Sequence, residues 1–143
     1  TIPRQEMKSK DKNVDDFKLP LTDEAIAILK EQYLYTSNKE YVFVADSGVH
    51  LNQETPNRAL ERLGFNDDAR GRRQRLHSFR GTFRSIVETN QMAHRCSYES
   101  REKVLDHAIG TQTERAYTNK ADYSQEMRIL LNWWSDYILS IKD

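Results

Sequence analysis

The sequence predicts a mainly helical α+β fold with a small β-hairpin or sheet at its N-terminus. Apolar residues recur at three- and four-residue intervals in five stretches, which is the period of a helix with one buried face. Only residues 1–21 and 41–44 are rich in extended or β-favouring sequence. At 143 residues the chain is long enough for a single domain with a buried core.

The first 21 residues are expected to form an extended hairpin that leads into a helix. Residues 1–3 and 17–21 are short extended segments on either side of a charged turn. Thr22 is suited to cap the following helix, because its hydroxyl can accept a hydrogen bond from a first-turn N–H. That helix is expected to end near Tyr35, with Ile26, Leu29, Tyr33 and Leu34 on its inner side.

Turn residues and apolar periodicity predict the remaining elements. The β-rich run at residues 41–44 ends at the turn 46–48, and Asn52 and Gly64 mark the ends of the next helix. Further helices are expected over residues 77–89, 97–105 and 121–141. The side chains expected on the buried faces of the first and last of these are Phe79, Phe83, Ile86, Val87, Met127, Leu130, Leu131, Trp134 and Ile138.

Positive charge is concentrated in one segment, although the net charge of the chain is zero. Residues 70–84 contain six arginines and no acid, whereas acids gather at residues 11–16 and 122–143. A local field of this kind suits contact with nucleic-acid phosphates, and the alternative is a solvated basic loop. The arginines expected to contact DNA phosphates are Arg70, Arg72, Arg73, Arg75 and Arg84.

Composition argues against membrane, secreted and zinc-binding proteins. No apolar run approaches the roughly 20 residues of a membrane span, and no signal-peptide pattern opens the chain. Cys96 is the single cysteine, so an internal disulfide cannot form and a reducing cytoplasm is the expected location. His77, His94, His107 and Cys96 lack the paired spacing of structural zinc ligands, so no metal is expected.

Four kinds of residue have a joint use around one phosphodiester. His77 and Arg80 lie three residues apart on a predicted helix and therefore share a face. A guanidinium can hold two phosphate oxygens, and the imidazoles of His77 and His107 can donate hydrogen bonds or move a proton. Tyr117, ten residues after His107, offers an oxygen nucleophile, and the N-terminal hairpin offers lysines.

Four segments that carry these residues resemble the tyrosine recombinase family, in particular its phage and genomic-island integrases. The segments read TIPRQEMKSKDKNVDDFKLPLTDEAIAIL, FVADSGVHLNQETPNRALERLGF, HSFRGTFRSIVETN and VLDHAIGTQTERAYTNKADY. They occur in the family's order and cover nearly the whole chain. The resemblance implies the family's catalytic-domain fold, a helical bundle with a small N-terminal hairpin.

The resemblance also implies a role for each motif residue. Tyr117 would attack the scissile phosphate and form a 3′-phosphotyrosine intermediate. Arg80 would be the second of the family's two catalytic arginines, and His77 would bond the same phosphate. His107 would assist as a hydrogen-bond donor or proton acceptor.

Two assignments leave alternatives open. Lys8 matches the lysine that protonates the leaving 5′-oxygen, but Lys10 and Lys12 are close in sequence. Tyr117 is selected only by its position relative to His107, and Tyr98 and Tyr123 also lie near that histidine in sequence.

The resemblance implies an integrase that acts on double-stranded DNA attachment sites as a tetramer of protomers, without a cofactor. The first catalytic arginine and the DNA-binding domains would precede Thr1, so the chain is expected to be the C-terminal part of the catalytic domain. Alone it is expected to be inactive, and monomeric without DNA. The expected setting is the cytoplasm of a bacterial host, with the gene in a prophage or another mobile element.

Three other functions remain open at this point. A non-catalytic DNA-binding module would use the arginines but would give no reason for His107 and Tyr117. A degenerate integrase would keep the fold without the reaction. A type IB topoisomerase would share the chemistry and would relax supercoils instead of joining two sites.

Overall fold

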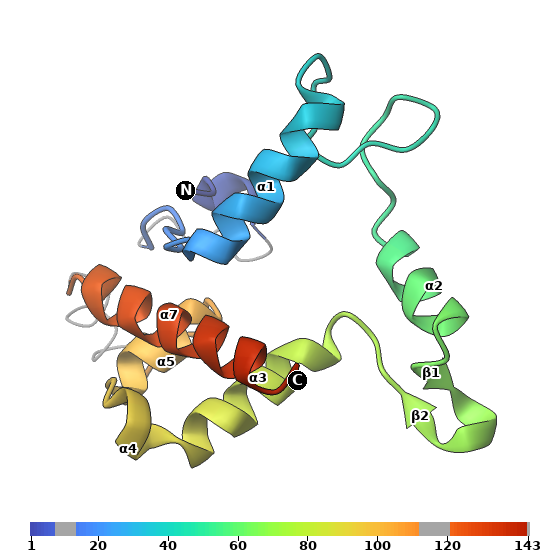
Figure 1. Ribbon diagram of the computed structural model, residues 1–143. Helices are drawn as coiled ribbons and strands as arrows, with labels where there is room; N and C mark the ends of the chain where they lie inside the picture. The colour runs from blue at the N-terminus through green and yellow to red at the C-terminus, as the bar shows by residue number, and fades with distance from the viewer. Residues whose placement is uncertain (8–13, 112–120, 143) are drawn as a thin grey trace. The chain divides into compact units, whose positions relative to one another are not determined.

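The structure is a computed structural model that describes residues 1–7, 14–111 and 121–142 (Figure 1). Helices dominate these residues, which confirms the predicted mainly helical fold. The α-helices are α1 (Asp23–Thr36), α2 (Thr55–Arg62), α3 (Ser78–Thr89), α4 (Gln91–His94), α5 (Tyr98–Val104) and α7 (Ser124–Ser140). The remaining elements are two 3₁₀ turns, η1 (Arg4–Glu6) and η2 (Asp68–Arg70), and two strands, β1 (Asn66–Asp67) and β2 (Arg72–Arg73).

The chain divides into two compact units. The first unit contains Thr1–Thr22 and Val87–Asp143, and the second contains Asp23–Ile86. Helix α3 crosses the boundary between Ile86 and Val87, so most of this helix belongs to the second unit and only its last turn belongs to the first.

The core of the first unit lies where α4 and α5 pack against α7. Its buried apolar side chains are Val87, Cys96, Val104, Leu105, Ile109, Met127 and Leu130. Ser97 starts α5, because its side chain accepts a hydrogen bond from the backbone N–H of Ser100 at 3.2 Å. The helix predicted from residue 97 is therefore confirmed, and Cys96 packs in the core as a small apolar residue.

The expected N-terminal hairpin is present at its base. Ile2 and Phe17 form an antiparallel bridge in which each N–H donates to the other's carbonyl, at 2.8 and 2.9 Å. The predicted turn over residues 8–13 lies outside the described residues.

Short turns and one antiparallel pair of strands organise the second unit. Val44 and His50 form a bridge around the predicted turn, and Gly48 takes a positive φ of 84° there. Gly64 ends the segment of α2, as predicted, with a φ of 77°. Strands β1 and β2 pair in the register Asn66 with Arg73 and Asp67 with Arg72, and no apolar alternation had indicated them.

Several side chains predicted to be buried are exposed instead. On α1, Leu34 is 77% exposed and Tyr33 is 62% exposed, while Ile26 and Leu29 are half-buried. Phe79 on α3 and Ile138 on α7 are also exposed. Periodicity selects a face of a helix, but burial of that face needs a packed neighbour at each turn. Of α1, only Thr36 is buried, where its hydroxyl lies 3.0 Å from the Val42 carbonyl.

The final helix begins at Ser124, three residues later than predicted. Asp122 accounts for this start, because its carboxylate accepts a hydrogen bond from the Ser124 backbone N–H at 2.9 Å. Trp133 and Trp134 are half-buried and pack with Tyr137, with ring centroids 5.4 and 5.9 Å from that ring. Among the described helices, none has both the length and the apolarity that crossing a membrane requires.

Candidate functional site

His77 and Arg80 lie together at the start of α3, as their spacing predicts. Asn57 of α2 holds the approach to this helix, because its side-chain oxygen accepts from the Leu76 backbone N–H at 2.9 Å. The His77 carbonyl accepts from the Arg80 backbone N–H at 3.2 Å, which closes the first turn. Both side chains are exposed.

The same two residues line a broad groove of about 1030 Å³ in the second unit. Its apolar wall includes Tyr41, Phe43 and Leu76, and His50 lies in the same lining. The rings of Tyr41 and His50 meet edge to face, with centroids 5.7 Å apart. Sequence reasoning did not select His50, and the only available signal was its position just before the next helix start.

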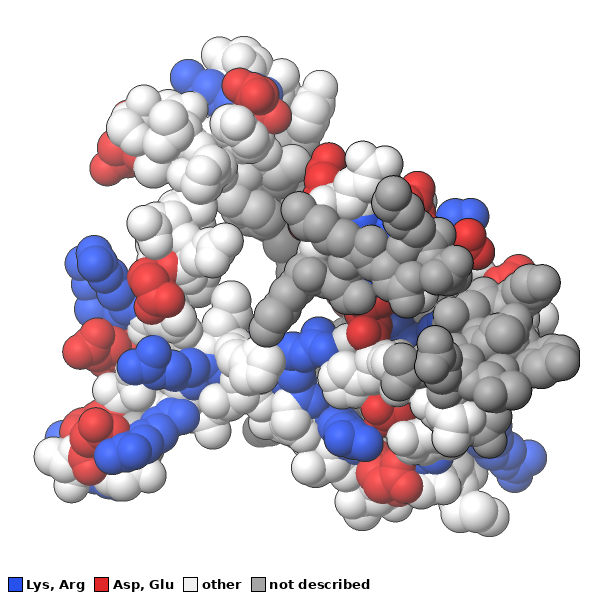
Figure 2. All heavy atoms as spheres, turned by 180° about the vertical axis from the view of Figure 1, so that it is seen from behind, with Lys and Arg blue, Asp and Glu red and all other residues white. Residues whose placement is uncertain are grey.

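Acidic residues partly neutralise the arginine-rich segment. Arg70 pairs with Asp67 at 3.3 Å, and Arg73 pairs with Asp68 at 2.8 Å. Both acids directly precede the basic run in the sequence. Basic and acidic side chains also lie beside one another on the face that Figure 2 shows. The arginine count therefore overstates the positive field, because at least two of the five proposed DNA contacts already have a carboxylate partner.

The structure describes the side chains of two of the other three proposed arginines. Arg75 and Arg84 are exposed. Arg72 lies in β2, and only its backbone belongs to the described structure.

His107 follows α5 in the first unit, where Glu102 holds its ring. The Nδ1 atom of His107 lies 2.7 Å from a carboxylate oxygen of Glu102, and the backbone N–H of His107 donates to the Glu102 carbonyl at 3.0 Å. Because a carboxylate only accepts, Nδ1 is the donor in this contact. The Glu102 side chain is 8% exposed, whereas that of His107 is 36% exposed.

Glu102 is a site residue that sequence reasoning missed. It precedes His107 by five residues and lies near the end of α5. An acid near a candidate histidine was the available signal, but the pairing depends on how the chain turns after Val104.

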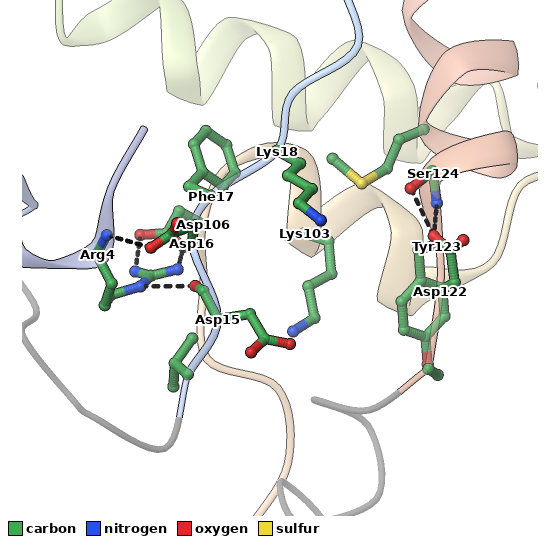
Figure 3. A pocket seen from close by; sticks show the side chains of 13 residues that line it. Arg4, Asp15, Asp16, Phe17, Lys18, Lys103, Asp106, Asp122, Tyr123 and Ser124 are labelled. Carbon is green, nitrogen blue, oxygen red and sulfur yellow. Dashed lines mark hydrogen bonds and ion pairs between the residues drawn. The ribbon is translucent and has the colours of Figure 1, made fainter. Parts of the chain in front are cut away.

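A hollow of about 270 Å³ lies beside the His107 segment in the first unit (Figure 3). Arg4, Asp106 and Lys103 contribute to its lining, together with Asp122 and Tyr123 at the start of α7. Burial lowers the pKa of Lys103, an effect that Arg4 adds to and that Asp106 and Asp15 oppose.

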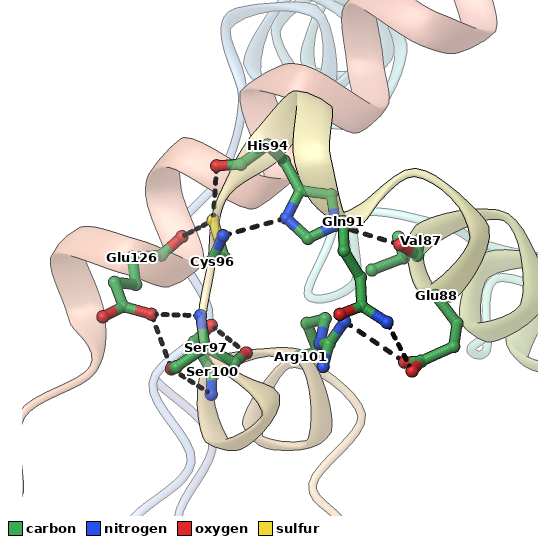
Figure 4. Close-up of polar contacts among 9 residues, drawn as sticks. All are labelled: Val87, Glu88, Gln91, His94, Cys96, Ser97, Ser100, Arg101 and Glu126. Carbon is green, nitrogen blue, oxygen red and sulfur yellow. Dashed lines mark hydrogen bonds and ion pairs between the residues drawn. The ribbon is translucent and has the colours of Figure 1, made fainter.

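A polar cluster holds α5 against α7 and so fixes the helix that leads to His107 (Figure 4). One carboxylate oxygen of Glu126 accepts from the Ser97 backbone N–H at 2.8 Å and from its hydroxyl at 2.6 Å. These bonds hold the pKa of Glu126 below its ordinary value. Burial raises the pKa of the neighbouring Cys96 thiol, and the charge of Glu126 raises it further.

His94 and Cys96 are hydrogen-bonded to each other within this cluster. The Nδ1 atom of His94 accepts from the Cys96 backbone N–H at 3.0 Å, and its Nε2 lies 2.9 Å from the Val87 carbonyl. Among the described residues, no group of three or more His, Cys, Asp and Glu side chains is arranged to hold a metal ion.

The predicted residues therefore differ in how far the structure describes them. It brings His77 and Arg80 together in the second unit, and it gives the surroundings of His107 in the first. Lys8 and Tyr117 lie outside the described residues, as do the alternatives Lys10 and Lys12.

The two alternative tyrosines lie in the first unit. Burial raises the pKa of Tyr123, and the charges of Glu99 and Glu126 raise it further. Tyr98 is exposed and lies under the Arg101 guanidinium, 5.8 Å from the ring centroid. A raised pKa disfavours the phenolate, which is the more reactive form of a tyrosine nucleophile.

Comparisons with known proteins place the sequence in a family. Residues 2–123 match the profile described as the phage integrase family. The chain is 28% identical over 125 residues to the putative protein IntB of Escherichia coli (strain K12), covering 84% of this chain and 29% of that protein. It is 29% identical to the prophage integrase IntA of the same strain, covering 86% of this chain and 28% of the relative.

A phage protein gives a similar match. The chain is 24% identical over 136 residues to the integrase of Enterobacteria phage P4, covering 92% of this chain and 28% of that integrase. This chain thus spans less than a third of the length of these relatives. No solved structure gave a significant match. Because the family profile covers most of its length, this chain belongs to the phage integrase family of tyrosine recombinases.

Proposed function

We propose that this chain carries catalytic residues of a site-specific recombinase that cleaves and rejoins DNA through a phosphotyrosine intermediate at Tyr117. The observation that carries the proposal is the order of the motifs inside the matched region. His77-x-x-Arg80, His107 and Tyr117 all lie within residues 2–123, which match the phage integrase family. The exposed pair at the start of α3 supports it, because a DNA phosphate can approach both side chains from outside.

Arg80 and His77 would bind the scissile phosphate. The guanidinium offers parallel N–H donors that match two non-bridging oxygens. Those oxygens gain charge as the nucleophile attacks, so donors already in position stabilise the transition state more than the ground state. The groove beside this pair offers apolar side chains that suit sugar and base surfaces of the bound strand.

His107 would act on the same phosphate through Nε2. The contact between Glu102 and Nδ1 sets the tautomer and orientation of the ring. Depending on the step, Nε2 would accept the phenol proton of Tyr117 or, when protonated, donate to a phosphate oxygen.

The bond changes balance without a cofactor. The phenol oxygen of Tyr117 forms a bond to the scissile phosphorus while the bond from phosphorus to the 5′-oxygen breaks. The phosphate stays on the 3′ end of the cleaved strand. Lys8 would give a proton to the departing oxygen, which leaves as a 5′-hydroxyl. Rejoining reverses both steps, so the energy of the phosphodiester is kept in the protein–DNA link.

We propose further that this chain is the catalytic part of a longer protein. The curated relatives are more than three times as long as the matched segment. A further catalytic arginine and DNA-binding domains outside these 143 residues would complete the enzyme. Its partners would be double-stranded attachment sites and three further protomers in a tetramer, in a bacterial cytoplasm and encoded by a mobile element. The loss of one phosphate-holding arginine costs about 3 kcal/mol or more of transition-state stabilisation, so the chain alone should cleave DNA poorly. Without DNA, the chain alone should be a monomer.

The test is covalent trapping of the full-length protein on a nicked substrate, from which the cleaved strand diffuses away. The parental protein should form a protein–DNA product that resists denaturation, and Tyr117→Phe should form none, because phenylalanine lacks the nucleophile. Tyr123→Phe is the matched control and should keep the product. Trapping by Tyr117→Phe, or its loss only in Tyr123→Phe, would refute the assignment.

Two further arms separate the remaining candidates. The 143-residue chain tested alone should give little trapped product, and robust trapping would contradict the need for an outside arginine. Relaxation of supercoiled plasmid without any joining of two sites would favour a topoisomerase. Binding of DNA without trapping would favour a non-catalytic or degenerate protein.

A further inference from the structure

Arg4 is buried, and each of its three guanidinium nitrogens donates a hydrogen bond to an acceptor in the first unit. Its Nη1 and Nη2 atoms donate to the two carboxylate oxygens of Asp106 at 2.9 and 3.0 Å. Its Nε donates to the Asp15 carbonyl at 3.1 Å, and its backbone N–H donates to the Asp16 carboxylate at 2.9 Å. The Arg4 side chain is only 10% exposed. Figure 3 shows the guanidinium held between these partners.

Asp106, the main partner of Arg4, directly precedes His107 in the sequence. Its φ of 51° lies in the left-handed region, which is uncommon for a residue with a side chain. The chain reverses here as α5 ends, with the Asp106 backbone N–H donating to the Lys103 carbonyl at 3.0 Å. A bidentate ion pair at this residue opposes relaxation of the backbone to a more common conformation.

We propose that Arg4, through its ion pair with Asp106, is a positioning residue for His107. The inference rests on the proposed function, in which His107 acts on the scissile phosphate. Glu102 holds the ring of His107 from one side, and Arg4 fixes the backbone turn from which the ring projects. The pair joins residues 102 positions apart, so it ties the N-terminal segment to the His107 loop.

Burial separates this role from direct contact with DNA. All three guanidinium nitrogens of Arg4 have a protein acceptor, and the side chain is almost covered. A phosphate would have to displace Asp106 or Asp15 to reach it. The effect of Arg4 on cleavage should therefore pass through the position of His107.

The test measures single-turnover cleavage by the full-length protein in two backgrounds. Arg4→Lys keeps the charge but loses the two-pronged contact, and Asp106→Asn keeps a residue that tolerates a positive φ but loses the carboxylate. Each should slow cleavage about tenfold or more, because small misplacements of a catalytic group are costly. In a His107→Ala background the same substitutions should change the rate by less than about twofold, because the group that they position is gone.

Arg101→Lys is the matched control. The Arg101 side chain is 9% exposed and forms an ion pair with Glu88 at 3.2 Å, so its replacement perturbs the ion pair of a similarly buried arginine in the same unit. It should leave the cleavage rate of folded protein within about twofold of the parental rate. Equal slowing of cleavage by Arg4→Lys in both backgrounds, or no more slowing than Arg101→Lys causes, would overturn the positioning role.

A measurement without catalysis keeps the inference separate from the proposed function. In NMR spectra of protein labelled at histidine, Arg4→Lys should shift the ring signals of His107, and Arg101→Lys should leave them in place. Unchanged His107 signals in Arg4→Lys would contradict the inference even if the protein cleaves DNA. Absence of any covalent DNA product from the parental protein would instead refute the proposed function.

Discussion

Single polar side chains decide the local conformation around the proposed site. Glu126 is one example, because its carboxylate joins the start of α5 to α7 through both the backbone N–H and the hydroxyl of Ser97. Ser97 also caps α5 through the Ser100 backbone N–H. The hydroxyl of Ser97 therefore serves two contacts at once, and each can be tested through stability.

Ser97→Ala should lower the free energy of unfolding by about 1 kcal/mol at neutral pH, the usual effect of losing a helix cap. Part of that loss should depend on pH. The pKa of Glu126 is lowered in the folded state from its ordinary value of 4.5, so its contacts stabilise the fold above that pH. The contribution is lost as the pH falls through the lower, folded pKa.

Urea unfolding of both proteins at neutral and acidic pH measures this directly. The difference between the parental protein and Ser97→Ala should shrink as Glu126 becomes protonated. Ser140→Ala, at the exposed end of α7, is a control that should show no such pH dependence. A difference that stays constant from neutral pH to well below 4.5 would contradict the role of the Glu126 charge.

At the scale of elements, the strand pair β1–β2 changes how the arginine-rich segment can meet DNA. Its turn places Arg70 and Arg73 beside Asp67 and Asp68. An arginine that already has a carboxylate partner releases fewer counterions when it meets a phosphate. Arg75 follows the strand pair, is exposed and forms no ion pair among the described residues.

Arg75→Gln should therefore reduce the salt dependence of DNA binding more than Arg73→Gln does. Loss of one phosphate contact lowers the slope of log K against log salt concentration by about 0.9. The expected change for Arg73→Gln is smaller, since Asp68 already pairs with that side chain at 2.8 Å. Titrations of the full-length protein at several salt concentrations measure both slopes. Equal losses for the two variants would show that the acidic partners do not weaken the basic segment.

Sequence signals located the helices wherever a local residue defines the end of the helix. Ser97 and Gly64 act within one turn of their helix, so α5 and α2 were predictable. Strands β1 and β2 were not, because a pair of two-residue strands has no apolar alternation, and Gly71, with a φ of 66°, forms its turn. The burial expected for Leu34 was wrong because it depends on neighbours that a local pattern does not contain.

The candidate site shows the same division between local and long-range information. The placement of His77 and Arg80 at the same groove is consistent with their three-residue spacing, from which a shared helix face was predicted. The ion pair between Arg4 and Asp106 joins residues 102 apart, and no spacing rule indicates such a contact. Sequence order also ranked Tyr117 above Tyr98 and Tyr123, and that choice stays a prediction because Tyr117 lies outside the described residues.

At the scale of the whole molecule, the proposed chemistry needs residues that lie far apart in the sequence. His77 and Arg80 belong to the unit Asp23–Ile86, whereas His107 belongs to the unit that contains Val87–Asp143. A single phosphate can be cleaved as proposed only if these side chains and Tyr117 meet around it. The central claim is therefore that these residues act on one phosphate, and membership of the phage integrase family supports it.

The most direct measurement is a solved structure of the full-length protein trapped on a nicked attachment-site substrate. The predicted result is a covalent bond between the Tyr117 oxygen and the 3′-phosphate. Arg80, His77 and Nε2 of His107 should lie within hydrogen-bonding distance of the oxygens of that phosphate. A phosphate bonded to another residue, or one contacted by neither Arg80 nor His107, would contradict the proposed site.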